Sequence, residues 1–174
     1  LPCYILPLSA KTSEALKNRV ADMLEALDGG KIHEADISSL AYTLQEGRHH
    51  FSYRAVIVIE SLKHAKDLWG AFMRGEMRPN SVSGQVTREF VSKKPIERVV
   101  KDLTAESRSL KQKPLEYQDS ITALADFYCQ GYQLDWRLLY SDVMPQKIAL
   151  PTYPFVREQY WVRTDCEEGL CSSS

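Results

Sequence analysis

The sequence predicts an α+β fold: a small three-stranded sheet with helices packed on it, followed by a helical segment and an extended C-terminal strap. Three observations support this prediction. Short apolar runs of strand type occur at three places in the first half of the chain. Stretches with apolar residues at helical spacing separate them. Near the C-terminus, two prolines and four aromatic residues fall within a stretch that suits neither a helix nor a central strand.

The chain begins with a predicted strand and helix. Tyr4–Leu8 is apolar, and Pro7 cannot donate to a ladder, so we expect a strand near a sheet edge. Thr12 or Ser13 can cap the helix that follows, and Gly29-Gly30 ends it. Its predicted apolar stripe is Leu16, Val20, Met23, Leu24 and Leu27.

A second helix and the strongest strand come next. Asp36 suits the N-cap position of this helix, and Gly47 is expected to end it. Phe51–Ile59 alternates apolar residues onto both faces, which is typical of a central strand. The buried face of the helix is predicted to carry Ile37, Leu40, Ala41 and Leu44.

The third helix starts after Ser61 and closes at Gly75, and a weaker strand, Val82–Val86, follows. Ile57 of the central strand and Leu68 of this helix should be among the most buried residues. The helix is expected to pack through Leu62, Ala65, Leu68, Trp69, Phe72 and Met73.

Residues 88–114 are rich in charge and serine. A short helix can begin at Pro95, and we expect Thr104–Pro114 to be a loosely ordered, mobile loop. A last helix should run from about Leu115 to Gln130, with Gly131 after it. Asp135 can then cap a short helical turn that carries Trp136, Leu138, Leu139 and Tyr140.

The strap is the stretch Leu150–Val162. Pro151 and Pro154 fix their own φ angles and push the residues before them toward extended conformations. Because the strap carries Tyr153, Phe155, Tyr160 and Trp161, it is too apolar to remain in solvent and should lie in a groove. We expect the first two of these rings on the chain's own domain and the last two against a neighbouring domain.

Two sets of residues resemble linker sequences of the ketosynthase–acyltransferase region of modular polyketide synthases, the first the linker that closes the region and the second a string that sits just after the ketosynthase. The first is Leu134-Asp135-Trp136, Leu139-Tyr140 and the run from Ile148 to Trp161, which reads I-A-L-P-T-Y-P-F and then R-E-Q-Y-W. The second lies more than ninety residues earlier, where Ile37 to Arg48 reads I-S-S-L-A-Y-T-L-Q-E-G-R. The resemblance covers roughly Pro2 to Val162.

The resemblance implies a non-catalytic subdomain that follows a ketosynthase, packs against it in the same polypeptide and helps dock a free-standing acyltransferase. It also implies a synthase of the trans-acyltransferase type, because the two linker halves are joined here without an acyltransferase between them. The predicted domain-interaction residues are Leu150, Pro151, Thr152, Tyr153, Pro154, Phe155, Arg157, Tyr160 and Trp161.

The resemblance and the local composition together divide the chain into four parts. Residues 1–87 form the sheet-and-helix core, and residues 88–114 form a charged connecting segment at the position of the missing acyltransferase. Residues 115–162 form the last helix and the strap. Residues 163–174 are expected to be a mobile tail, in part vector-derived.

Composition excludes several classes of function. A net charge of −1 gives no nucleic-acid-binding surface, and no apolar run approaches the ~20 residues that span a bilayer. The four cysteines lie at no metal-ligand spacing and are expected to be reduced, in a cytoplasmic protein. We expect no cofactor and no metal. A start without methionine suggests a fragment of a longer chain.

The sequence shows no catalytic set. His49-His50 is interpreted as a solvated turn and Cys129 as a small core residue, since no nucleophile–base motif accompanies them. Gly-x-Ser-x-Gly, P-loop and dinucleotide-binding motifs are missing. Two alternatives remain at this point: a small α/β hydrolase or transferase of unfamiliar type, and a passive spacer between modules.

Overall fold

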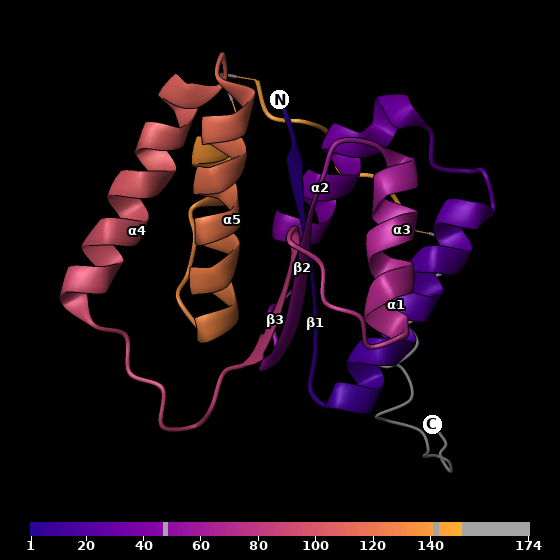
Figure 1. Ribbon diagram of the computed structural model, residues 1–174, viewed down its shortest axis with the longest axis horizontal. Coiled ribbons are helices and arrows are strands. Elements are labelled where there is room, and N and C mark those ends of the chain that lie inside the picture. The colour runs from indigo at the N-terminus through magenta and orange to yellow at the C-terminus, as the bar shows by residue number, and fades with distance from the viewer. Residues whose placement is uncertain (47–48, 141–142, 151–174) are drawn as a thin grey trace, which may run out of the picture.

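The computed structural model describes residues 1–46, 49–140 and 143–150 (Figure 1). Three strands form one antiparallel sheet in the order β1-β2-β3, so the central strand is the predicted one. The strands are β1 (Tyr4–Ala10), β2 (Tyr53–Ile59) and β3 (Ser81–Gln85). The helices are α1 (Ser13–Asp28), α2 (Ile37–Glu46), α3 (Leu62–Met73), α4 (Lys94–Ser107) and α5 (Pro114–Gln130). Short 3-10 turns are η1 (Glu34–Asp36), η2 (Arg108–Leu110) and η3 (Trp136–Leu139).

Two hydrophobic cores lie on opposite faces of the sheet. Residues Ala55, Ile57 and Ile59 of β2 contribute to the first core, with α1, α2 and α3. Val56 and Val58 contribute to the second core, with α5 and η3. Figure 1 shows α4 and α5 on one side of the sheet and α1 and α3 on the other. The alternation of β2 therefore builds both cores, as a strand that is apolar on both faces should.

The predicted helix starts are largely confirmed. The Thr12 hydroxyl accepts from the N–H of Ala15 (3.0 Å), and the Ser61 hydroxyl accepts from the N–H of His64 (3.1 Å). Asp36 acts differently from the prediction. Its carboxylate accepts from the N–H of His33 (2.9 Å) and so closes the turn before α2. Ile57 and Leu68 are both buried, as predicted.

The expectation of a loosely ordered loop from residue 104 onward is wrong over residues 104–110, which are helical. Thr104 and Ser107 are buried in α4 although both are polar. Each hydroxyl donates to a carbonyl one turn back, Thr104 to Val100 (2.7 Å) and Ser107 to Leu103 (2.8 Å), so burial leaves neither hydroxyl unpaired. Serine and threonine are common in loops, so the composition of this stretch predicted a loop although its backbone is helical.

Helix α5 lies close against the sheet. A Cβ atom on Gly84 of β3 would lie 3.1 Å from the carbonyl oxygen of Cys129, so glycine permits this approach. Cys129 is buried, as predicted for a small core residue. Gly131 ends the helix with a φ of 123°. None of the helices in the described ranges is long and apolar enough to cross a membrane.

Candidate interaction surface

Two stretches that lie far apart in the sequence come together beside β1. Helix α2 contacts η3, and the segment of residues 143–150 contacts α2 through Ile148. These stretches are the two that carry the resemblance to the polyketide synthase linker. We call this region the motif junction: α2 together with residues 134–140 and 143–150. Its side chains form one connected network, so the two motifs form one structural unit.

Gln45 lies at the centre of the motif junction and is only 2% exposed. Its Nε2 donates to the carbonyl oxygen of Ile5 in β1 (3.0 Å). Its Oε1 accepts from the hydroxyl of Tyr140 (2.9 Å), whose ring packs edge-on against Tyr42 at 5.4 Å. Burial raises the pKa of the Tyr140 hydroxyl, which remains a neutral donor. One buried amide thus joins the sheet edge to the C-terminal segment.

Thr43 anchors the segment that leads into the strap. Its hydroxyl donates to the carbonyl of Ser39 (2.6 Å) and accepts from the backbone N–H of Ile148 (2.9 Å). Ile148 and Leu150 pack against the first core, and the residue between them is exposed. This alternation is that of an extended chain with one side facing the protein. The chain is therefore held along α2 as far as Leu150.

Additional contacts tie both ends of this segment. Met144 packs against the second core, so residues 144–150 pass from one core to the other. The ammonium of Lys147 lies 5.9 Å from the centre of the Tyr42 ring. Arg137 of η3 forms an ion pair with Glu46 of α2 at 3.4 Å. The Arg137–Glu46 and Lys147–Tyr42 contacts involve partly or fully exposed groups and add little stability beside the buried hydrogen bonds.

His50 does not lie in a solvated turn, and that interpretation is wrong for this residue. Its Nε2 donates to the carbonyl of Gln45 (2.9 Å), and its Nδ1 accepts from the hydroxyl of Tyr128 (2.5 Å). Its ring stacks on Trp136 at 6.0 Å. Burial lowers its pKa, and the nearby Arg54 charge adds to that effect. His49, in contrast, is exposed, as predicted. His50 thus links α2 to α5 as a neutral ring.

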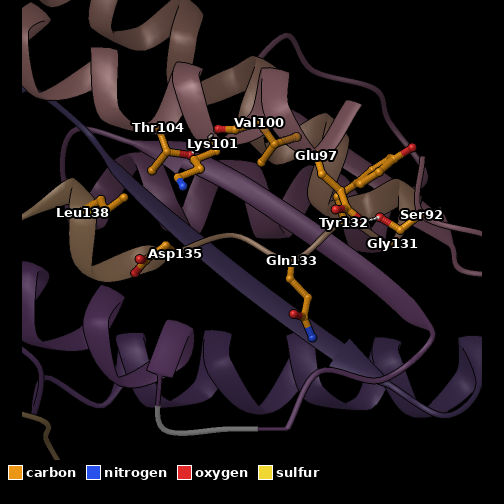
Figure 2. Close-up of a pocket in the computed structure, with 10 residues that line it drawn as sticks. All are labelled: Ser92, Glu97, Val100, Lys101, Thr104, Gly131, Tyr132, Gln133, Asp135 and Leu138. Carbon is orange, nitrogen blue, oxygen red and sulfur yellow. Dashed lines mark hydrogen bonds between the residues drawn. The ribbon is translucent and has the colours of Figure 1, made fainter. Parts of the chain in front are cut away.

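Two hollows lie along residues 131–138, the segment that follows α5. One, of 360 Å³, is lined by residues that include His50, Arg54 and Trp136. The other, of 530 Å³, lies between α4 and residues 131–138 (Figure 2). Figure 2 shows Val100, Lys101 and Thr104 approaching it from α4, with Asp135 and Leu138 on the opposite wall. Its lining is mixed, and Ser92 donates to the Glu97 carboxylate at one end.

Neither hollow holds a catalytic arrangement. The His50–Tyr128 pair comes nearest to one, but both ring nitrogens of His50 are engaged and Tyr128 is buried. Burial raises the pKa of the Cys3 and Cys129 thiols to about 12, so neither forms a thiolate nucleophile near pH 7. In the ranges that the structure describes, no group of three or more His, Cys, Asp or Glu could hold a metal ion.

Of the predicted interaction residues, the structure describes Leu150, which is partly buried on the first core. The others lie outside the described residues: Pro151, Thr152, Tyr153, Pro154, Phe155, Arg157, Tyr160 and Trp161. The sequence reasoning missed the roles of Thr43 and Gln45, and of Ile148 as a partner of Thr43. A signal was present, since Thr43 and Gln45 lie within the run Leu40–Gln45, whose other residues are all apolar, and therefore need partners if that run is buried.

Comparisons with known proteins agree with this architecture. The family described as "CurL-like, PKS C-terminal" matches residues 4–68. Polyketide synthase PksN of Bacillus subtilis is 31% identical over 159 residues, and PksL of the same organism is 30% identical over 162 residues. Each match covers 91% of this chain. The chain spans only 3% of the length of either relative.

Solved structures of polyketide synthase ketosynthases are also similar to this chain. Ketosynthase twelve of the bacillaene polyketide synthase from Bacillus amyloliquefaciens is 30% identical, with a TM-score of 0.62 over 87% of this chain and 24% of that one. The module 6 ketosynthase of the bacillaene synthase from Bacillus subtilis has the same fold, with a TM-score of 0.71 at 21% identity, over 88% of this chain and 26% of that one. The chain therefore belongs to the polyketide synthases, as a flanking (linker) subdomain whose residues 4–68 are of the CurL-like, PKS C-terminal family.

Proposed function

We propose that the chain is a non-catalytic, cytoplasmic subdomain that follows a ketosynthase in the same polypeptide and packs against it. The observation that carries this proposal is the bond between Thr43 and Ile148 in the motif junction. It fixes the extended chain on the subdomain up to Leu150, the first residue of the strap. A strap that leaves from a fixed point loses less conformational entropy when it docks than a free tail does.

The aromatic end of the strap is the proposed contact with the ketosynthase. In this proposal Tyr153 and Phe155 lie on the subdomain, while Tyr160 and Trp161 bind the neighbour. Each aromatic side chain can bury about 150–250 Å², so two of them provide substantial contact area. Pro151 and Pro154 stiffen the path between the anchor and these rings.

The synthase is proposed to be of the trans-acyltransferase type. Residues 86–113 connect β3 to α5 and contain one helix of 14 residues, α4, together with η2. In the linker that the sequence resembles, an acyltransferase is inserted in this part of the chain, and the connection here is too short to hold one. A free-standing acyltransferase would then supply the acyl group, and we propose that this subdomain contributes to its docking.

The two alternatives find less support. A hydrolase or transferase needs an accessible nucleophile beside a base, and the described residues bring the buried Tyr128 to a fully engaged His50. A passive spacer has no need of a buried network between α2 and a segment ninety residues later. That network favours a defined direction of the strap over simple spacing.

The test is to supply this chain in trans to the ketosynthase that precedes it in its polyketide synthase, and to measure binding by calorimetry. We expect the full chain to bind, a chain ending at Leu150 to bind at least about tenfold more weakly, and the Tyr160→Ala/Trp161→Ala variant to resemble the truncated chain. Equal binding by all three would overturn the proposed role of the strap.

A separate measurement addresses the acyltransferase. The same chain, alone and joined to its ketosynthase, is titrated with the free-standing acyltransferase of the same system. Binding that requires residues 1–150 supports docking on this subdomain. Binding to the ketosynthase alone with the same affinity leaves no role for it. A spacer would bind neither protein.

A further inference from the structure

The two edges of the sheet differ in whether another strand could pair with them. At the β1 edge, α2 packs alongside the strand, and the carbonyl of Ile5 is occupied by the Gln45 amide. The next residue that faces outward is Pro7, which has no N–H to offer. An edge with a covering helix, an occupied acceptor and a missing donor cannot extend the sheet. This edge is closed.

The β3 edge is open. The N–H of Val58 donates to Asn80 (2.9 Å) and that of Val86 donates to Ser52 (2.8 Å), so the even-numbered residues of this strand pair with β2. The backbone groups of Ser81, Ser83 and Gln85 therefore face away from the sheet.

The outward groups of β3 are largely unpaired. The N–H of Ser81 donates to Arg78 (3.1 Å). The carbonyl of Ser81 and both backbone groups of Ser83 and Gln85 make no hydrogen bond within residues 1–46, 49–140 and 143–150. Figure 1 shows helices on both faces of the sheet but none across this edge.

The side chains along this edge lack the features that usually prevent an edge strand from pairing with another strand. Ser81–Gln85 contains no charged residue and no proline, and Ser83 and Gln85 are exposed. Exposed apolar side chains flank the strand: Met77 before it is 94% exposed, and Val91 after it is 74% exposed. The edge and its two ends thus offer unpaired backbone groups between exposed apolar residues.

We propose that the β3 edge binds the β3 edge of a second copy of this chain, antiparallel about a two-fold axis at Ser83. Ser83 then lies opposite its own copy, and Ser81 lies opposite Gln85, so no charged residues meet within the five paired positions. Beyond the strand, the same register sets Arg78, which is paired with Glu76 of its own copy, across from Arg88 of the other. The outward N–H and C=O groups of the two copies can then form about four hydrogen bonds with one another. The start of each strand meets the end of the other, which brings Met77 of one copy beside the loop that carries Val91 of the other.

This self-complementarity is what favours a second copy over an unrelated extended segment. A five-residue strand pair buries far less than the ~1,200 Å² of a stable interface, so the association is weak and concentration-dependent. It is independent of the strap and of any ketosynthase contact. The proposal therefore stands or falls separately from the proposed function.

The test uses a charge exchange at the two-fold axis. Wild type, Ser83→Lys and Ser83→Glu are studied as full chains by sedimentation equilibrium over increasing concentration. Wild type is expected to rise from the monomer mass toward the dimer mass. Each variant alone places like charges face to face and stays monomeric. An equal mixture of the two pairs Lys with Glu and is expected to associate about tenfold more tightly than either variant alone.

Matched controls are Ser109→Lys and Ser109→Glu, at an exposed serine in the turn between α4 and α5. These are expected to associate as wild type does. Circular dichroism checks that every variant is folded. The proposal is overturned if wild type remains monomeric at all concentrations, if charge at position 83 leaves its association unchanged, or if the mixture behaves as the separate variants do.

Discussion

The backbone N–H of Ile148 lies 2.9 Å from the hydroxyl oxygen of Thr43, a residue more than a hundred positions earlier in the chain. The same hydroxyl donates to Ser39 at 2.6 Å, so both its donor and an acceptor site are in use. Thr43 is buried, and the strap begins two residues after Ile148. This single side chain therefore connects the stability of α2 to the direction in which the strap leaves.

Replacing Thr43 with valine removes the hydroxyl that makes both hydrogen bonds and should therefore affect both roles. Valine keeps the shape but leaves the Ile148 N–H without its acceptor, at an expected cost of about 1–2 kcal/mol in the free energy of unfolding. Amide exchange at Ile148 should accelerate as well. Thr43→Ser keeps the hydroxyl and serves as the control, with Ile148 still protected. Unchanged exchange at Ile148 in the valine variant would show that the bond does not hold the segment.

The Gln45 amide should be coupled energetically to Tyr140. Gln45→Leu removes partners from both the Ile5 carbonyl and the Tyr140 hydroxyl, and each buried group left unpaired costs about 1–3 kcal/mol. Tyr140→Phe alone removes the hydroxyl and leaves the Gln45 Oε1 without its donor. In a double-mutant cycle measured by urea unfolding, the two changes should be non-additive, because the doubly substituted chain leaves only the Ile5 carbonyl unpaired. Strictly additive losses would exclude a direct bond.

Stability should depend on the protonation of His50. Its pKa is lowered in the folded chain from the ordinary value of 6.5, mainly by burial, so the unfolded chain takes up the proton first as pH falls. The contribution of the neutral ring is complete above the unfolded pKa. It is lost as pH drops below about 6.5 toward the lower folded value.

Urea unfolding at a series of pH values measures this effect. The slope of stability against pH below neutrality should be reduced in His50→Gln. His49→Gln, at the exposed neighbouring position, is the control and should keep the wild-type slope. If both variants retain the wild-type slope, His50 is not the group responsible.

Local patterns predicted most of the fold. The alternation of Phe51–Ile59 identified the central strand, and Thr12 and Ser61 marked helix starts, because these signals depend on neighbours in sequence. The end of α4 was missed. Thr104 and Ser107 look like loop residues until their hydroxyls are seen to bond within the helix. Such bonds depend on the helix already being formed.

The candidate site was predictable in part. The resemblance named both halves of the motif junction, but nothing in either half indicates that Thr43 pairs with Ile148 or Gln45 with Tyr140. The role of His50 was missed for the same reason, since its partners Tyr128 and Trp136 lie far along the chain. Contacts at long sequence separation are set by how the helices pack, and the spacing of a single stretch contains no information on that.

Gly131 should be much less tolerant of substitution than Gly30. Both have positive φ, 123° and 75°, so alanine strains the backbone at either position. At Gly30 a Cβ would meet nothing within 4 Å, whereas at Gly131 it would lie 2.9 Å from side-chain atoms of Phe90 and Val86. We expect Gly30→Ala to cost about 1 kcal/mol in the free energy of unfolding. Gly131→Ala should cost at least ~2–3 kcal/mol, because backbone strain is added to steric overlap.

Thermal and urea unfolding of the two variants measure this difference, with far-UV circular dichroism to confirm that both fold. A second variant locates its cause. Phe90→Leu, introduced beside Gly131→Ala, shortens the side chain that the new methyl would meet and should recover part of the loss. If the two glycine variants lose equal stability and Phe90→Leu recovers none, the loss at Gly131 comes from backbone strain alone. The turn after α5 would then not be packed against the β3–α4 connection as closely as these distances require.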